Sequence, residues 1–466
     1  MRKSLAVLLA LLVSACKVGP TYRPPQTPPP AAGAFQTAAP GTDAAAPRDD
    51  WWRLYDDPTL DALVRQALAA NTDLRVARAN LQRAQAALSE ARADRLPQGQ
   101  TTASQQYGNT GGFAGQGGGA KQWTSNGAID VAWEIDLFGR LARTIEAARA
   151  DRDAIEAVRD RVALTVAAET ARAYVDACAF AEAATVARSS ADIATRQLGL
   201  LDRRERAGAG TRLDVERAAT ALANVRAELP TLEGRRQAAL FELAALLGAT
   251  PAEVPQAARQ CVRSPKVLQA IPVGDGRALL ARRPDVREAE RKLAADTARI
   301  GVATAELYPS ISLGGSGGFF RNDTVRGSDS FTFGIGPLLS WSFPSVLAGR
   351  TRIAQAEATT QASLATFDGT VLTALKEVEQ ALSYYAAEND RNQRLREALA
   401  HAETAFDLAD RRYRAGSMAL FEQLDAQREL TTARGALASS DQLLGSRRID
   451  LFKALGGGWA DTASAR

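Results

Sequence analysis

Two long stretches without proline restrict this chain more than any other feature of its sequence. No proline occurs between residues 98 and 229, and none occurs from residue 345 to the end. Both stretches are rich in Ala, Leu, Arg, Glu and Gln, which favour the α-helix most strongly. The pattern over 140–206 predicts a single helix of 67 residues. Such a helix would be about 100 Å long, a length that is typical of coiled coils and periplasm-spanning tubes rather than of globular domains.

Two segments, 99–134 and 310–344, interrupt the helical pattern and are rich in Gly, Ser, Thr and aromatic residues. In the first, Trp123, Val131 and Trp133 stand in an alternating pattern with residues of another character. A period of two residues predicts β-strands whose two faces differ. Each segment is therefore predicted to form a hairpin. The expected strand pairs are 99–109 with 121–133, and 310–320 with 330–341.

These hairpins carry the pattern of a membrane β-barrel, in which apolar residues alternate and aromatic residues lie near the strand ends. Four strands cannot close a barrel, because the smallest membrane barrels have about eight. Open sheet edges are not tolerated in lipid. The chain must therefore oligomerise through its sheet, and two, three or four copies would give 8, 12 or 16 strands. We predict an α+β membrane protein made mostly of long helices, with four membrane strands per chain.

The N-terminus has the organisation of a bacterial lipoprotein leader. Arg2 and Lys3 precede a short apolar run, and residues 1–15 are predicted to form a signal peptide. Small residues followed directly by Cys16 resemble a lipobox, which predicts a covalent lipid on Cys16. The alternative is an ordinary signal peptide with a chance cysteine. Lys17 follows, where aspartate would favour retention in the inner membrane, so the expected location is the outer membrane.

The two halves of the chain repeat one another. Residues 71–75 match 283–287 at an offset of 212, and Gly208 with Leu213 matches Gly416 with Phe421 at an offset of 208. A shared order of helix, hairpin, long helix, Gly turn and returning helix predicts an internal duplication. The expected organisation is a lipid-anchored, Pro-rich tether without a packed core (16–50), helices of repeat 1 (51–98), hairpin 1 (99–134), long helices and tip turn (135–260), linker and helices of repeat 2 (261–309), hairpin 2 (310–344), long helices and tip turn (345–456) and a tail (457–466).

Composition and motifs argue against an enzyme. The net charge of +4 is too small to favour nucleic acid. The chain has one histidine and no HExxH, Cys-x-x-Cys, Walker or nucleophile-elbow motif, so no metal site, cofactor or catalytic residue is expected. The Gly-rich loop 111–119 lacks the Gly-Lys-Ser/Thr of a phosphate cradle. Cys178 and Cys261 are too few for a disulfide framework and are expected to be unpaired.

A family resemblance becomes specific at residues 133–140, which read WEIDLFGR. This octapeptide resembles the signature of the outer membrane factor family, the TolC-like efflux channels, in their NodT/OprM-type lipoprotein branch. Further matches run along nearly the whole chain. They are Cys16 with Val18-Gly19-Pro20 and Tyr22, Trp52 with Asp57-Pro58, Arg282 to Val286, Leu424 to Arg428, and Ala454 to Trp459.

The resemblance implies a homotrimer with one 12-stranded barrel in the outer membrane and an α-barrel that extends into the periplasm. It implies a channel that passes substrates such as drugs, a periplasmic adaptor (membrane fusion) protein, and an inner-membrane pump of the resistance-nodulation-division type. Outer-membrane lipid is the other expected partner. Alternatives are a duct of the same fold that exports protein or metal ions, and a pore-less, lipid-anchored coiled-coil scaffold in the periplasm.

The resemblance also assigns a gate at the periplasmic end. Glu422 and Asp425 lie one helical turn apart and can share a face. Three copies would give a ring of six carboxylates, which would attract cations. Phe421 matches an apolar gate ring, and Arg428 lies three residues after Asp425 and could pair with it. Without the resemblance, the two carboxylates would be read as a solvated helix face.

Turn residues at the same end are expected to dock the adaptor. Gly208, Gly210 and Gly416 are predicted to permit left-handed backbone at helix ends. Asp214 and Tyr413 match family positions that tie neighbouring turns together.

The junction between barrel and helices is the third predicted site. The carboxylates of Glu134 and Asp136, two residues apart, could suggest a glycosidase. Their place at the exit of a predicted strand favours a structural role instead. The residues expected at such junctions are Trp133, Glu134, Asp136, Gly139, Pro309 and Pro344.

Overall fold

The structure is a computed structural model that describes residues 17–26, 31–109, 121–267, 269–341 and 346–457. Some predictions concern residues outside this set: the leader 1–15, Cys16, the Gly-rich loop 111–119, Pro344, and the tail beyond residue 457. The chain forms two compact units. Unit 1 comprises Met1–Pro25, Asn80–Glu156 and Glu288–Asp368, and unit 2 comprises Gln26–Ala79, Ala157–Arg287 and Gly369–Arg466.

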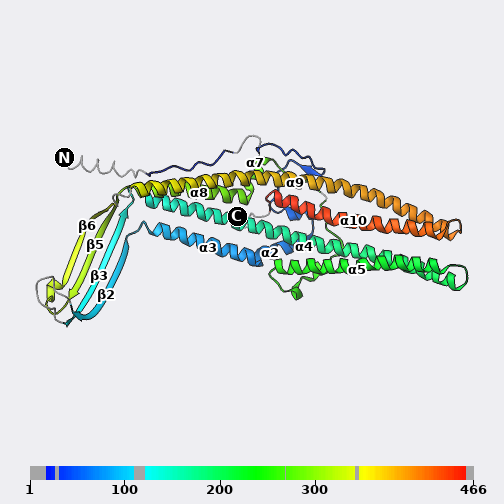
Figure 1. Ribbon diagram of the computed structural model, residues 1–466, viewed down its shortest axis with the longest axis horizontal. Helices are drawn as coiled ribbons and strands as arrows, with labels where there is room; N and C mark the ends of the chain where they lie inside the picture. The colour runs from blue at the N-terminus through cyan, green and yellow to red at the C-terminus, as the bar shows by residue number, and fades with distance from the viewer. Residues whose placement is uncertain (1–16, 27–30, 110–120, 268, 342–345, 458–466) are drawn as a thin grey trace. The chain divides into compact units, whose positions relative to one another are not determined.

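Most described residues are helical (Figure 1). The helices are η2 (Trp51–Tyr55), α2 (Pro58–Ala70), α3 (Thr72–Ala93), α4 (Arg140–Arg206), α5 (Arg212–Leu246), η3 (Pro251–Glu253), α6 (Gln256–Arg259), α7 (Gly276–Arg282), α8 (Pro284–Ala305), η4 (Gly327–Ser330), α9 (Val346–Arg414) and α10 (Leu420–Ala454). None of those described combines the length and apolar character needed to cross a membrane.

The predicted 67-residue helix is present as α4. Helix α2 begins where the sequence offers a cap. At α2 the Asp57 carboxylate accepts hydrogen bonds from the N–H groups of Thr59 and Leu60 at 2.8 and 3.1 Å, and Pro58 takes the first helical position, where no N–H is needed. Within unit 2, α5 lies along α4 and α10 lies along α9 (Figure 1).

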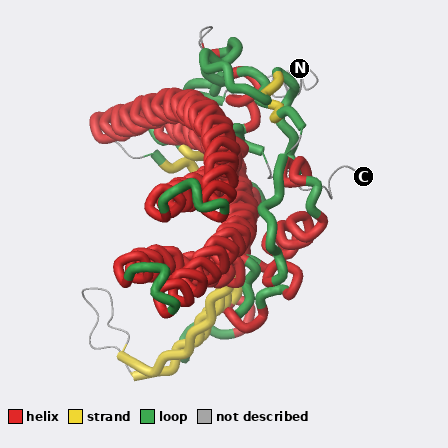
Figure 2. The backbone as a smooth tube through the Cα atoms, turned by 90° about the vertical axis from the view of Figure 1, so that its right-hand side faces the viewer, coloured by secondary structure: helices red, strands yellow, loops and turns green. Residues whose placement is uncertain are grey.

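Unit 1 contains one four-stranded antiparallel sheet in the order β2-β3-β5-β6. The strands lie side by side in Figure 1 and are yellow in Figure 2, and they occupy the ranges in which apolar and polar residues alternate. Their bounds are β2 (Gln98–Asn109), β3 (Lys121–Ile135), β5 (Ser310–Arg321) and β6 (Phe331–Ser340).

The register of the sheet separates its two faces by residue parity. Gln100 pairs with Asp130 and Asp130 with Ser316, so even-numbered residues share one face and odd-numbered residues the other. The odd face carries most of the large apolar side chains, including Trp133 and Phe333, which is 93% exposed. The even face is mostly Gln, Thr, Ser, Asn, Gly and Ala. The sheet thus exposes one apolar and one polar face, as the alternation predicted.

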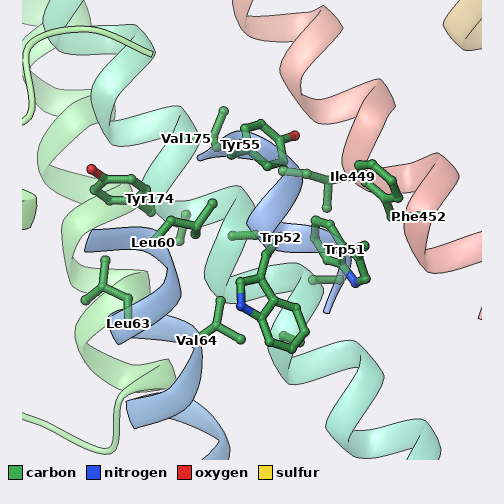
Figure 3. Close-up of a cluster of buried hydrophobic side chains, with 14 of the residues drawn as sticks. Trp51, Trp52, Tyr55, Leu60, Leu63, Val64, Tyr174, Val175, Ile449 and Phe452 are labelled. Atoms are coloured by element: carbon green, nitrogen blue, oxygen red, sulfur yellow. The ribbon is translucent and has the colours of Figure 1, made fainter. Parts of the chain in front are cut away.

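Unit 2 is held by an aromatic cluster around η2 (Figure 3). Trp51 is fully buried and stacks on Phe452 of α10 with ring centroids 4.7 Å apart. The hydroxyl of Tyr174 in α4 donates to the Asp57 carboxylate at 3.0 Å. The cluster therefore joins the segment that precedes α2 to both long-helix pairs of this unit.

The Pro-rich segment that follows residue 30 is extended, but it is bound along the helices. The N–H groups of Gln36 and Thr37 donate to the Glu379 carboxylate at 2.7 and 3.0 Å. Strand β1 (Thr42–Asp43) pairs in parallel with β4 (Ile271–Pro272). The described part of the predicted tether thus makes specific contacts with α9 and β4 that its composition did not reveal.

The prediction that Cys178 and Cys261 are unpaired was wrong. The structure joins them in a disulfide, with Cα atoms 5.1 Å apart and a sequence separation of 83 residues. Cys178 lies in α4, and the chain reverses through α5 and returns past α6 to bring Cys261 beside it. Pairing requires only that two Cβ atoms meet in space. The small number of cysteines was therefore no argument against a bond.

Candidate functional site

Two regions carry the predicted functional residues, one in each unit. The strand–helix junction of unit 1 comprises residues 133–143 together with the approach to β5 at 305–309. The helical tip of unit 2 comprises the turns 207–211 and 415–419 with the helix ends that flank them. They are described separately.

At the junction, both carboxylates of the WEIDLFGR segment accept hydrogen bonds from groups close to them in sequence. Glu134 accepts two hydrogen bonds from the Arg140 guanidinium, at 3.0 and 2.6 Å. These bonds hold the pKa of Arg140 above its usual value. Asp136 accepts from the N–H groups of Leu141 and Ala142 at 3.0 and 2.7 Å, so it satisfies two donors at the start of α4, where a negative charge is favourable. This geometry is that of a helix start.

Two tryptophans fasten the strands to the ends of the preceding helices in the same way. The Trp133 indole N–H donates to the carbonyl of Arg95 at 2.9 Å, shortly after α3 ends. The Trp341 indole N–H donates to the carbonyl of Leu307 at 3.2 Å, shortly after α8 ends. Sequence reasoning missed Trp341. It lies 208 residues after Trp133, the offset that already related the two Gly turns, and that spacing could have found it.

Gly139 and Pro309 lie at the two places where this region passes between a helix and a strand. Gly139 has φ +78°, and a Cβ there would lie 2.9 Å from the Lys17 side chain, so both conformation and space require glycine. Phe138 stacks on Tyr308 with ring centroids 4.5 Å apart. Pro309 follows Tyr308 and directly precedes β5, in which a proline at the start removes no ladder hydrogen bond.

Both tip turns end their helices with a left-handed glycine. Gly208 has φ +75° and Gly416 has φ +73°. The N–H of Ala209 donates to the Arg204 carbonyl at 2.8 Å, and that of Ser417 donates to the Arg412 carbonyl at 3.0 Å. Both are the long hydrogen bond of a Schellman motif, which satisfies carbonyls that the helix leaves free.

The prediction of left-handed backbone at Gly210 was wrong. Its φ does not lie in the left-handed region. A Cβ at this position would lie 3.3 Å from the backbone nitrogen of Glu205. Glycine is therefore needed here because the turn passes close to the preceding helix end, a requirement of space that the sequence could not distinguish from one of conformation.

Asp214 and Tyr413 make separate contacts. Asp214 forms a capping box with Thr211 at the start of α5. The Tyr413 hydroxyl accepts a hydrogen bond from Arg204 of α4 at 2.6 Å, and the guanidinium carbon lies 5.2 Å from the centre of the tyrosine ring. Tyr413 thus links α9 to α4 through Arg204, a residue that sequence reasoning did not single out.

The predicted gate residues lie in the first turns of α10. Phe421 is 61% exposed and has the Arg217 guanidinium 5.7 Å from its ring centre. Asp425 and Arg428 form the ion pair that their spacing predicted. Glu422 lies in the first turn, where the helix dipole favours a negative charge.

A hollow of about 900 Å³ in unit 2 brings three of these side chains together. Phe421, Asp425 and Arg428 line it beside residues of α4 and α5, among them Arg217. Glu422 is not among its lining residues. The hollow is therefore lined by both apolar and charged side chains.

Comparison with known proteins decides the family. The model of the family described as "Outer membrane efflux protein" matches residues 63–249 and 276–457, which is most of the chain. The chain belongs to the outer membrane efflux protein family. It is 30% identical to Nodulation protein T of Rhizobium leguminosarum bv. viciae, over 98% of this chain and 93% of the relative. It is 31% identical to the pyoverdine export outer membrane protein OpmQ of Pseudomonas aeruginosa, over 98% of this chain and 97% of the relative.

The fold agrees with this assignment. The structure superposes on that of the outer-membrane channel OprN with a TM-score of 0.87 and 36% identity, covering 95% of this chain and all of that chain. The chain is thus an outer-membrane efflux channel with a long periplasmic part, and members of this family are channels rather than enzymes. The resemblance noted at WEIDLFGR is confirmed.

Proposed function

We propose that this chain is the exit duct of a tripartite efflux pump, gated at its periplasmic tip. Three copies close a 12-stranded barrel in the outer membrane, and their long helices form the periplasmic α-barrel. A periplasmic adaptor docks at the tip, and an inner-membrane pump of the resistance-nodulation-division type supplies substrates such as drugs. OpmQ, a relative of similar length, is named for pyoverdine export, which supports small organic molecules as the substrate class.

The observation that carries this proposal is the four-stranded sheet with unlike faces and two unpaired edges. Among the strands that the structure describes, β2 and β6 each have a neighbour on one side only. An apolar outer face, a polar inner face and edges that require partners are what a multi-chain membrane barrel needs. Twelve strands spaced about 4.8 Å apart and tilted by about 40° would enclose a barrel of roughly 12 Å backbone radius. Glutamine, serine and Asp130 of the even face would line it.

Matched elements support an internal duplication of this duct. Helices α3 and α8 each have 22 residues, and α5 and α10 each have 35. Strands β2 and β5 each have 12 residues. In the trimer, two such repeats per chain would give six similar units around one axis. Six similar units can close a tube although only three chains are present.

The gate is proposed at Phe421, Glu422 and Asp425. Around a threefold axis the six carboxylates would attract cations, and the three phenylalanines would narrow the passage. Arg428 pairs with Asp425 and would moderate the charge of the ring. The adaptor would dock on the tip turns that contain Gly208, Gly210 and Gly416, together with Asp214 and Tyr413. A lipid on Cys16 would anchor the chain in the membrane.

Single-channel conductance in planar bilayers tests the duct and its gate together. We expect Glu422→Ala/Asp425→Ala to raise conductance and lower cation preference relative to the unchanged protein. Recordings at about 0.01 M salt are the most sensitive, because the Debye length is then about 30 Å and exceeds the barrel radius. The control is Glu403→Ala/Asp407→Ala, which removes two exposed carboxylates of α9, each in an ion pair, for the same change in net charge.

The outcomes separate the parts of the proposal. An unchanged pore in the gate variant would reject Glu422 and Asp425 as gate residues but keep the duct. An equal change in both variants would point to net charge rather than to the tip. No conductance in any of these proteins, or in Tyr413→Phe, which breaks the contact between Arg204 and Tyr413, would reject the duct and favour the lipid-anchored scaffold.

A further inference from the structure

The residues that directly follow Cys16 are held by a buried arginine of α4. Arg143 is 1% exposed. Its Nε donates to the carbonyl of Val18 at 3.1 Å and its Nη2 donates to the carbonyl of Gly19 at 3.0 Å. The third guanidinium nitrogen pairs with Glu146 at 3.1 Å. One guanidinium thus donates hydrogen bonds to two successive carbonyls of the N-terminal segment. The rigid, planar guanidinium of arginine allows this arrangement, and the ammonium of lysine does not.

Further contacts fix the same segment on the strand–helix junction. The N–H of Val18 donates to the Phe138 carbonyl at 3.3 Å. The Lys17 ammonium pairs with Glu146 at 2.5 Å, so Glu146 is shared with Arg143. Burial raises the pKa of Glu146, but the hydrogen bond and charge of Lys17 and the charge of Arg143 outweigh it and hold that pKa below its usual value.

Two glycines make this fit possible. Gly19 has φ +84°, and a Cβ on it would lie 2.5 Å from the Cα of Gly301 in α8. A Cβ on Gly301 would lie 2.7 Å from the Arg143 guanidinium. The segment and α8 therefore touch backbone to backbone, beneath the arginine. Beyond them, the Tyr22 hydroxyl donates to Glu290 of α8 at 2.7 Å. These contacts account for Gly19 and Tyr22 in the pattern that follows Cys16.

We propose that residues 17–22 are a docking segment that fixes the lipidated N-terminus at the strand–helix junction, with Arg143 as the positioning residue. The proposal rests on lipidation of Cys16, which is part of the proposed function. Cys16 is one residue from Lys17, about 3.8 Å along the chain, and Lys17 lies against Gly139. A lipid on Cys16 would therefore be attached close to the end of β3, near the level at which the proposed barrel would leave the membrane.

Native digestion with endoproteinase Lys-C measures this docking directly. Cleavage after Lys17 would release the dipeptide Cys16-Lys17 with its lipid, which mass spectrometry quantifies. Cleavage requires the segment to open, so its rate reports the population of the undocked state. We expect Arg143→Ala and Gly19→Ala to release the dipeptide at least about tenfold faster than the unchanged protein, which corresponds to about 1.4 kcal/mol. Arg143→Lys should fall between, because one ammonium cannot replace the fork.

The matched control is Arg152→Ala, which removes an arginine of the same helix that pairs with Glu156 and should release the dipeptide at the unchanged rate. Gly19 lies outside every helix and strand, so its variant tests docking even if Arg143→Ala does not fold. Equal release from the unchanged protein, Gly19→Ala and Arg143→Lys would overturn the proposal. Release of a dipeptide without lipid would instead refute lipidation of Cys16, and the comparison of rates would still show whether the segment docks.

Discussion

The disulfide between Cys178 and Cys261 gives the sharpest prediction about stability. Its removal by Cys178→Ala/Cys261→Ala, or by reduction, frees a closed loop whose ends are 83 residues apart. The chain-entropy relation for a loop of this length gives about 4.5 kcal/mol at 25 °C, as an upper value for the loss in the free energy of unfolding. Unit 2 contains both cysteines, so we expect the loss to be confined to the unfolding of that unit.

The assay is guanidinium unfolding of the purified protein in detergent, followed by circular dichroism with and without a phosphine reductant. Reduction should lower the midpoint of the unchanged protein and leave the double alanine variant where it is. That comparison matters because Cys178 is fully buried, so alanine there also removes packing, whereas reduction changes only the bond. Equal midpoints for the oxidised and reduced unchanged protein would refute the entropic argument. Alkylation of both thiols in denaturant without reductant would refute the bond itself.

Two further predictions concern the helical pairs of unit 2. Tyr413→Phe removes the oxygen that accepts from Arg204 and should raise single-channel conductance if this link restrains the tip; an unchanged conductance would assign Tyr413 to packing alone. Burial raises the pKa of Asp176 above its usual value, although hydrogen bonds from Gln442 and Ser446 lower it. The carboxyl therefore favours folding most when protonated, and the free energy of unfolding should fall as pH rises from about 3.8 through the raised pKa. Asp176→Asn should flatten that part of the pH profile, and an unaltered profile would contradict the assignment.

Local patterns predicted the elements of this fold well. The length of α4 follows from the absence of proline and from helix propensity over 140–206, both of which act within a few residues. The strand pairs and their two faces follow from a period of two residues. Ile129, Val131 and Trp133 share a face because of that period alone, whatever lies beyond the strand. These predictions of helices and strand faces succeed because both features depend on residues close together in the sequence.

The contacts missed by sequence reasoning join residues far apart in the chain. Arg143 is one of many arginines in an Ala- and Arg-rich helix, and nothing near it in sequence shows that it faces the carbonyls of Val18 and Gly19. The same holds for Arg204 with Tyr413. Cys178 and Cys261 meet only because α5 reverses the chain between them. The family resemblance singled out Tyr413 as a residue that ties neighbouring turns together, but it did not name Arg204 as its partner, and it pointed to neither Arg143 nor the cysteine pair.

The acidic residues show how geometry separates groups that look alike in sequence. The spacing of Glu134 and Asp136 in the sequence could suggest catalysis. In the structure, however, Glu134 accepts from Arg140 and Asp136 accepts from two backbone N–H groups. Both carboxylates are therefore occupied in forming the start of α4. Asp425 shares its charge with Arg428, whereas Glu422 is set apart from the hollow that those two residues line. Of the two proposed gate carboxylates, Glu422 is therefore the one whose removal should change cation preference more.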